Sequence, residues 1–394
     1  MRLSQFSLGG FVTSTLATNL YVSSYAGNIT SVQLSQLPNG AYSLNPVSVN
    51  DGSVPSPSWL TKDEYNDVVY CVDEGFGVPN SSIASYKTSK SGELTLIDRH
   101  LTIAGAVSTV VYNSGKGIAA AHYGNISGGS AVTSYTINAN GTLNPIQAFP
   151  FTLAQPGPNP DRQEAPHPHE AILDPTDSYI AVPDLGADLV RIFKIDPKTS
   201  LLTAVTPIPV PAGSGPRHGT FLKAACGNTY FFLISELANT IASYNVTYSD
   251  SGLSFQQLFI SGTYGNQSTP VGAAAAEAIL SPDHKFLLTS SRNASLFQIK
   301  NFDPKNSTLI PSDTLQVWAI DDATGKLDFK QLSPAGGAFP RQFSVNKNGT
   351  LAAVGLQNDG RVVVVSRDVK TGLYGDFVAS LDVPGQITSI IWDE

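Results

Sequence analysis

Short apolar runs, each bounded by turn residues, recur along almost the whole chain. Seven of them align as the second run of a repeated β-rich unit: NLYVSSYAG from Asn19, VVYCVDEG from Val68, GIAAAHYG from Gly117, YIAVPDLG from Tyr179, TYFFLISEL from Thr229, KFLLTSSRN from Lys285 and LAAVGLQND from Leu351. Their spacing of roughly fifty to sixty residues is what a four-stranded propeller blade needs. We therefore interpret them as the second strands of seven blades.

Other strands of the unit can be placed around these runs. First strands that end in similar turns are HEAILDPTD, GTFLKAACGN, EAILSPDH and RQFSVNKNG, and outer strands include LVRIFKID, TIASYNVTY and RVVVVSRDVKTGL. The Ala-rich VGAAAAEAIL resembles a helix in composition, but it occupies the place of the first strand in the fifth blade. We expect a strand there.

The two ends of the chain break the repeat in complementary ways. The chain opens on a second strand and finishes on ITSIIWDE, a first strand with nothing after it. Joined together they complete one blade, and a closed ring leaves no exposed sheet edge. The sequence therefore predicts an all-β, seven-bladed β-propeller, a single domain over residues 18–394, whose last blade is closed by the N- and C-terminal strands.

Composition and charge narrow the range of partners. Only 14% of residues are charged, and 34 Gly and 26 Pro suit many short strands joined by turns. The formal net charge is −8 and no run of Lys or Arg occurs, which argues against nucleic acid and anionic membrane surfaces as partners. No apolar run reaches 18 residues, so no membrane span is predicted.

Two features point to export from the cell. Residues 1–17 place an Arg before a modestly apolar stretch and then TLA, as in a weak signal peptide, although a strand-forming or disordered N-terminus is the alternative. An oxidising compartment would favour a disulfide between Cys71 and Cys226, but the repeat puts them in distant blades, so their pairing is left open. Nine glycosylation sequons occur, at Asn28, Asn80, Asn125, Asn140, Asn245, Asn266, Asn293, Asn306 and Asn348. We expect a secreted glycoprotein of a eukaryote.

Polar residues converge on one face of the predicted ring. A first strand lines the central channel and the second strand returns, so residues that begin first strands and residues that end second strands meet at the same channel mouth. Channel mouths on rigid scaffolds are common ligand sites. The residues at these positions are His167, His169, Glu170, Arg217, His218, Glu277 and Arg341 on first strands, and Glu74, His122, Tyr123, Asp184, Glu236 and Arg292 on second strands.

Their chemistry suggests roles for some of them. Arg217 and Arg292 present planar guanidinium groups that suit a carboxylate or phosphate. His169 with Glu236 can move protons near neutral pH. We expect these four to be catalytic and the remaining nine mouth residues to bind substrate. For Asp184, hydrogen bonding to the backbone of its own turn is an equal alternative.

A metal or cofactor is not expected. His167 and His169 share one face of a strand and could offer two ligands, but no third ligand follows at a recognisable spacing. The chain has no GxSxG elbow, Walker loop or dinucleotide fingerprint. A small-molecule substrate is the partner that we predict, and the sequence is silent on oligomeric state.

Five ordered segments resemble the lactonase family of seven-bladed propellers: PHPHEAILDPTDSYIAVPDLGADLVRIF, GSGPRHGTF, FFLISELANTIASY, AEAILSPDHKFLLTSSR and FPRQFSVNKNGTLAAVGLQNDGRVVVVSRD. That family includes bacterial-type 6-phosphogluconolactonase and the fungal carboxy-cis,cis-muconate cyclase. The resemblance implies a histidine, two arginines and a glutamate at the mouth, which match His169, Arg217, Arg292 and Glu236. The chain departs from the family pattern after Arg292 and at His122. With the sequons, the resemblance makes a fungal source our expectation.

Three functions follow as hypotheses. The first is a lactonase or cycloisomerase that opens or forms a lactone-like ring on a small oxygenated or anionic substrate, with an arginine clamp and His169/Glu236 proton transfer. The second is a cyclase recruited to fungal secondary metabolism, which performs a pericyclic or hetero-Diels–Alder cycloaddition on the same scaffold. The third is a non-catalytic propeller that binds a ligand.

Overall fold

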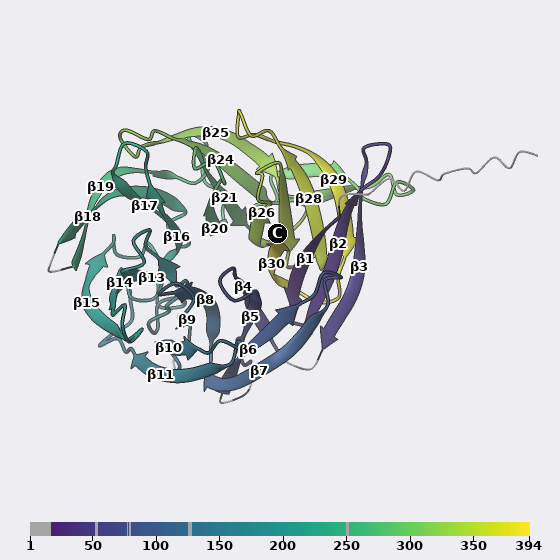
Figure 1. Ribbon diagram of the computed structural model, residues 1–394. Helices are drawn as coiled ribbons and strands as arrows, with labels where there is room; N and C mark the ends of the chain where they lie inside the picture. Colours follow the sequence, from purple (N-terminus) through teal and green to yellow (C-terminus); the bar gives the residue numbers. More distant parts are fainter. Residues whose placement is uncertain (1–16, 52–53, 77, 79, 125–127, 250–251) are drawn as a thin grey trace, which may run out of the picture.

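Seven four-stranded antiparallel sheets surround a central channel (Figure 1). The computed structural model describes residues 17–51, 54–76, 78, 80–124, 128–249 and 252–394. In order from the channel outward, blade 1 holds β4 (Pro57–Asp63), β5 (Val68–Asp73), β6 (Asn80–Thr88) and β7 (Leu94–Ile103), and blade 2 holds β8 (Ala106–Tyr112), β9 (Gly117–His122), β10 (Ala131–Ile137) and β11 (Leu143–Pro150). Blade 3 holds β12 (Ile172–Leu173), β13 (Tyr179–Asp184), β14 (Leu189–Ile195) and β15 (Leu202–Pro209).

The remaining blades follow the same order. Blade 4 holds β16 (Pro216–Lys223), β17 (Thr229–Ser235), β18 (Thr240–Ser249) and β19 (Gly252–Gly262). Blade 5 holds β20 (Ala274–Leu280), β21 (Phe286–Arg292), β24 (Thr314–Ile320) and β25 (Leu327–Pro334), with a hairpin of β22 (Phe297–Lys300) and β23 (Leu309–Ser312) inserted between its second and third strands. Blade 6 holds β26 (Pro340–Val345), β27 (Leu351–Leu356), β28 (Arg361–Arg367) and β29 (Tyr374–Asp382).

Blade 7 joins the two ends of the chain, as the sequence predicts. Its inner strand is β30 (Ile387–Asp393), followed outward by β1 (Ala17–Ser24), β2 (Asn28–Gln36) and β3 (Tyr42–Asp51). Asn19 pairs with Asp393 and Val22 with Ile390. Figure 1 shows the purple N-terminal strands beside the yellow C-terminal ones. The all-β seven-bladed fold with this closure is confirmed, and the Ala-rich segment forms strand β20.

Apolar side chains lie between neighbouring sheets, which explains why the second strands read as nearly continuous apolar runs. Every residue of β5, β9, β13, β17, β21 and β27 is buried. Each pair of adjacent blades shares a cluster of buried apolar side chains, and blades 4 and 5 share two. The cluster between blades 6 and 7 joins Val364 to Ile390. Burial on both faces of a sheet favours unbroken apolar runs over alternation. The ring is therefore held together by inter-blade packing.

Three further predictions concern the signal peptide, the two cysteines and membrane spans. The signal peptide falls on residues outside those described, except that Ala17 begins β1. Cys71 is buried, Cys226 is exposed, and both thiols are free. Among the described residues no helix is long and apolar enough to span a membrane.

The glycosylation sequons stay predictions. Of the predicted acceptors, Asn125 lies outside the described residues, and Asn28 and Asn245 are half-buried. The side chains of Asn80, Asn140, Asn266, Asn293, Asn306 and Asn348 are exposed.

Candidate active site

β-Bulges at the ends of the inner strands turn side chains toward the channel mouth. In blade 4, Pro216 pairs with Ser235 and His218 with Ile234, so Arg217 is an extra residue in the register. Arg341 in blade 6 is skipped in the same way. A bulge bends its strand and redirects the side chain of the extra residue. The consecutive residues Arg217 and His218, which would face opposite ways in a regular strand, consequently both belong to the site.

A long connection between β11 and β12 supplies the histidine of the site. The backbone N–H of His169 donates to the carbonyl of Pro183 at 2.9 Å, and the buried side chain of Gln163 donates to the carbonyl of Leu185 at 2.9 Å. Gly186 permits this close packing, since a Cβ there would lie 1.8 Å from the carbonyl oxygen of Ala165. The segment 151–171 is thus fixed to blade 3 by its backbone.

The site encloses a cavity of about 140 Å³ at the mouth. Four guanidinium groups and two carboxylates line it, which gives a surplus of two formal positive charges. Every blade from 1 to 6 contributes to the lining, which consists of Glu74, Val107, Tyr123, Arg162, His169, Arg217, Glu236, Arg292 and Arg341. Seven of these nine residues are among the predicted site residues.

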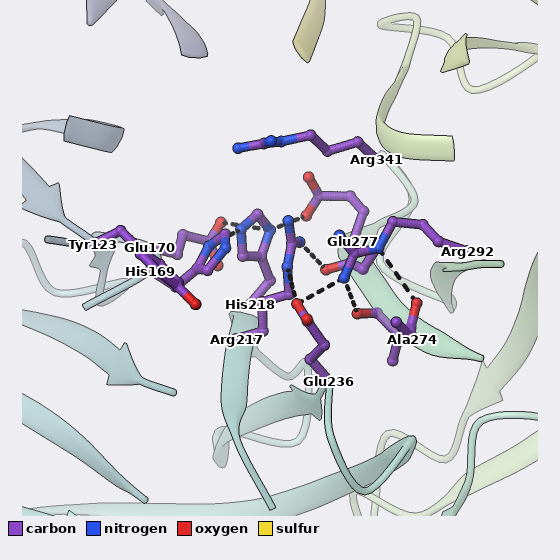
Figure 2. A network of polar contacts seen from close by, with 12 residues as sticks. Tyr123, His169, Glu170, Arg217, His218, Glu236, Ala274, Glu277, Arg292 and Arg341 are labelled. Atoms are coloured by element: carbon purple, nitrogen blue, oxygen red, sulfur yellow. Dashed lines mark hydrogen bonds and ion pairs between the residues drawn. The ribbon is translucent and has the colours of Figure 1, made fainter. Parts of the chain in front are cut away.

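Three arginines surround Glu236, whose side chain is 3% exposed. Its Oε2 lies 2.6 Å from Nη2 of Arg292 and 3.0 Å from Nε of Arg217 (Figure 2). Its Oε1 lies 2.6 Å from Nη2 of Arg162. Burial acts to raise the pKa of Glu236, but the opposing effects of Arg292, Arg217 and Arg162 together hold it well below its usual value.

Glu236 therefore stays ionised at neutral pH and is poorly suited to proton transfer, which requires a pKa near the working pH. The catalytic role expected of Glu236 stays a prediction, and the contacts of its carboxylate support a role in organising the arginines. The Arg217–Glu236 contact is an ion pair without a well-directed hydrogen bond, since Nε of Arg217 has no hydrogen-bond partner among the described residues.

Both arginines also donate to the backbone of blade 5. Nη2 of Arg292 donates to the carbonyl of Ala275 at 3.2 Å, and Nη1 of Arg217 donates to the carbonyl of Ala276. Burial and the adjacent cation Arg292 lower the pKa of Arg217 to about 9, which leaves the guanidinium charged at neutral pH. Both arginines are held rigidly at the cavity wall.

Arg341 stands apart from this group and extends over it in Figure 2. Its Nη1 donates to the hydroxyl of Tyr25 at 2.8 Å, and its Nη2 lies 3.8 Å from Oε2 of Glu74. The hydroxyl of Tyr25 in turn donates to Glu74. This cluster connects blades 6, 7 and 1 across the mouth.

His169 is the one histidine that lines the cavity. Its Nδ1 lies 3.0 Å from Nε2 of His218, and Nδ1 of His218 lies 2.8 Å from Oε1 of Glu277. Burial and then Arg217, His218, Arg341 and Arg292 hold the pKa of His169 well below its usual value. Burial likewise lowers the pKa of His218 to about 4, although Glu277 opposes this shift. Both imidazoles are therefore neutral near pH 7.

One cluster among the described residues has the composition of a metal site. The ligand atoms of Glu170, His218 and Glu277 lie within 4.8 Å of one another. Nδ1 of His218 is already engaged by Glu277, while Oε2 of Glu170 accepts from the N–H of Gly219 at 2.8 Å. Burial and the charge of Glu277 raise the pKa of Glu170, which disfavours a second carboxylate there. These contacts describe a hydrogen-bonded cluster.

Other predicted binding residues face away from the cavity. Both ring nitrogens of His122 are within hydrogen-bond distance of protein atoms, at 2.9 Å from the carbonyl of Ile103 and 2.8 Å from Oγ1 of Thr133. Asp184 accepts from the N–H of His167 at 2.6 Å and pairs with Arg191 at 2.7 Å. The expectation that His122 and Asp184 contact substrate stays a prediction, and the contacts that the structure shows for both residues serve the blade structure.

His167, the first histidine of the PHPH segment, and three neighbouring residues have supporting positions. The ring of His167 stacks on Tyr123 with centroids 4.0 Å apart, and its Nδ1 lies 2.8 Å from the Tyr123 carbonyl. His167, Glu170, His218 and Glu277 lie behind the cavity wall and do not line it. Their expected contact with substrate stays a prediction, and the structure shows contacts with lining residues, such as His167 with Tyr123 and His218 with His169.

Three residues of the site were not predicted from the sequence. Arg162 lies in the irregular segment before His169, Val107 occupies a bulge in β8, and Tyr25 follows β1. Position within the repeat signals residues at strand ends, so Tyr25, directly after a second strand, was accessible to that reasoning. Arg162 carries no such signal.

The chain is similar to known proteins over nearly its full length. A family model described as lactonase, 7-bladed beta-propeller, matches residues 19–391. A protein of Arthroderma benhamiae named "Probable 6-phosphogluconolactonase" is 29% identical over 371 residues, which cover 94% of this chain and 88% of that one. The 6-phosphogluconolactonase of Bacillus subtilis is 23% identical over 343 residues, which cover 84% and 85%.

A solved structure shows the same fold. The periplasmic gluconolactonase of Pseudomonas aeruginosa superposes with a TM-score of 0.80 at 24% identity, and the match covers 96% of this chain and 99% of that one. This shared fold agrees with the family match. The chain belongs to the lactonase family of seven-bladed β-propellers.

Proposed function

We propose that this protein hydrolyses a small anionic lactone in the cavity at the channel mouth. The observation that carries the proposal is the presence of a neutral histidine, His169, in the wall of a cavity with a surplus of two positive charges. An anionic substrate would balance that surplus. The names of the relatives support ring-ester hydrolysis, since they are called 6-phosphogluconolactonases.

The reaction needs a base, a site for the oxyanion and an acid. Neutral His169 takes a proton from water as the water oxygen bonds to the lactone carbonyl carbon. Arg217 and Arg292 stabilise the oxyanion that forms, because a buried guanidinium is fixed before the reaction begins. The ring C–O bond then breaks, and the His169 imidazolium returns its proton to the departing oxygen.

Glu236 contributes by fixing the clamp. It shares both carboxylate oxygens among three guanidinium groups, so Arg217 and Arg292 are held at a constant separation. Arg162 is 41% exposed and carries donors that its contact with Glu236 leaves unused. We assign Arg162 to a remote anionic group of the substrate, such as a phosphate or carboxylate.

Product mass and charge preference test this function. Wild-type protein is incubated with 6-phosphogluconolactone and with neutral glucono-δ-lactone, and the products are followed by mass spectrometry. We expect a gain of one water and a kcat/KM at least about tenfold higher for the charged lactone, as one well-placed ion pair contributes. In a third incubation, conversion of an unsaturated diacid at unchanged mass would instead indicate a cycloisomerase. Summed masses in any incubation would indicate a cycloaddition, and no reaction in all three would favour a binding protein.

Export and glycosylation are proposed separately. The exposed sequons at strand ends and turns support them, as does the leader-like composition of residues 1–17. Native protein should lose mass on treatment with an N-glycosidase, and an unchanged mass would contradict the proposal.

A further inference from the structure

The side chains behind His169 form a directed row that ends on a buried carboxylate. His169, His218 and Glu277 lie in line in Figure 2, each within hydrogen-bond distance of the next. The side chains of His218 and Glu277 are both 1% exposed. Neither lines the cavity, and the hydrogen bond between His218 and His169 connects them to it.

The direction of each hydrogen bond can be derived from the far end of the row. Oε1 of Glu277 accepts from the backbone N–H of Ala278 at 2.9 Å, and this amide can only donate. As a carboxylate, Glu277 can only accept, so the same oxygen also accepts from Nδ1 of His218, which carries the proton. Because His218 is neutral near pH 7, its Nε2 is left as an acceptor.

His169 must then donate to His218. Its Nδ1 carries the proton, and its Nε2 is the unprotonated nitrogen. No hydrogen bond to Nε2 is found within the described residues, and His169 lines the cavity, so this lone pair is available to a water or substrate.

We propose that His218 and Glu277 are positioning residues that hold His169 in the one tautomer able to act as a base at Nε2. The proposal rests on the function given above. When Nε2 takes a proton, the positive charge on His169 is shared along a row that ends on the Glu277 carboxylate. An analogous carboxylate that orients a catalytic histidine contributes up to about 10⁴-fold to turnover in serine proteases.

Two substitutions separate the parts of this row. Glu277→Gln keeps an oxygen that Ala278 N–H can bond, so it should preserve the tautomer while removing the charge. Glu277→Leu removes the acceptor, so neither His169 nor His218 should be held in a single tautomer. We expect kcat to fall about tenfold or more in Glu277→Gln and at least about 100-fold in Glu277→Leu, within the range for general acid–base catalysis, with KM changed less than threefold.

Nitrogen-15 NMR of histidine-labelled protein reads the tautomer directly and without a substrate. The chain has six histidines, and the His169 signals are assigned by their absence in His169→Gln. Wild type and Glu277→Gln should show a protonated Nδ1 and a bare Nε2 on His169, and Glu277→Leu should show a mixture. Asp174→Asn, which changes a buried turn carboxylate distant from the cavity, should match wild type.

The outcomes distinguish this proposal from the proposed function. A protonated Nε2 in the wild type would overturn the row even if lactones are hydrolysed. A bare Nε2 with no hydrolysis of any lactone would leave the row intact and contradict the function. Should Glu277→Leu not fold, His218→Gln in the same measurement tests the row. Stoichiometric divalent metal in purified protein, lost in Glu277→Gln, would also overturn it, because Nδ1 of His218 would then be a ligand.

Discussion

The proposed hydrolysis depends on the ionisation of a single residue, His169. Burial and the surrounding Arg217, His218, Arg341 and Arg292 lower its pKa below the usual value of about 6.5. Tyr123 also faces it, edge-on at 5.6 Å. A base with a lowered pKa is active when neutral, so activity is retained above the lowered pKa and lost as the pH falls through it.

This predicts the position of the acidic limb of the rate profile. We expect kcat/KM for an anionic lactone to stay constant from pH 7.5 down through 6.5 and to fall only at a lower pH. The measurement is a pH–rate profile in which substrate ionisation is titrated separately. An acidic limb at or above pH 6.5 would show that an ordinary or raised histidine controls the rate.

Glu236 gives a second prediction at the same scale. Glu236→Gln removes the one negative charge that three arginines share, and we expect a loss of about 3–5 kcal/mol in the free energy of unfolding at neutral pH. Because the folded-state pKa lies below the unfolded value of about 4.3, ionised Glu236 stabilises the fold above that value, and the contribution is lost as the pH falls.

Urea unfolding at several pH values checks both parts. The difference between wild type and Glu236→Gln should be largest near pH 7 and should shrink in acid. Asp328→Asn breaks the exposed Lys330–Asp328 pair and should change stability little at any pH. A difference that is small at neutral pH would mean that the arginines do not depend on Glu236.

At the scale of elements, the segment 151–171 needs a glycine in the neighbouring turn. Gly186→Ala would place a Cβ 1.8 Å from the Ala165 carbonyl oxygen and 2.9 Å from Cδ2 of His167, so the segment must move. We expect a lower melting temperature and a fall in kcat/KM of about tenfold or more, since a displacement of 1 Å can cost about 100-fold.

A matched substitution controls for the loss of a glycine. Gly262 lies in the outer strand β19, and the nearest atom to an added Cβ would be 3.9 Å away. Gly262→Ala should leave both the melting temperature and kcat/KM close to wild type. Equal behaviour of the two variants would contradict the packing role of Gly186.

The elements also show what the sequence could reveal of this site. Repeat position placed Arg217, Glu236, Arg292 and His169 at one mouth, because strand ends of successive blades meet there. It could not show that a bulge makes Arg217 and His218 face the same site, since a bulge changes register without changing composition. His122 and Tyr123 both come at the end of one second strand, so position in the repeat could not show that the ring nitrogens of His122 bond to Ile103 of blade 1 and Thr133 of blade 2.

At the scale of the whole molecule, the ring depends on the blade that joins its ends. Ile390 of β30 is fully buried in the cluster between blades 6 and 7. We expect Ile390→Ala to cost about 2–5 kcal/mol in the free energy of unfolding, as for other buried large-to-small changes. Ile260, 46% exposed on β19, is the matched control, and Ile260→Ala should cost less than about 0.5 kcal/mol. Urea unfolding measures both, and equal costs would contradict closure by packing.

We propose that one neutral histidine and an arginine clamp hydrolyse an anionic lactone at this mouth. The most direct test is kcat/KM for 6-phosphogluconolactone in wild type, His169→Gln and Arg292→Ala, with folding verified by circular dichroism. We expect water-dependent ring opening by the wild type and a loss of at least about 100-fold in kcat/KM in each variant. A loss smaller than tenfold in both variants would contradict it.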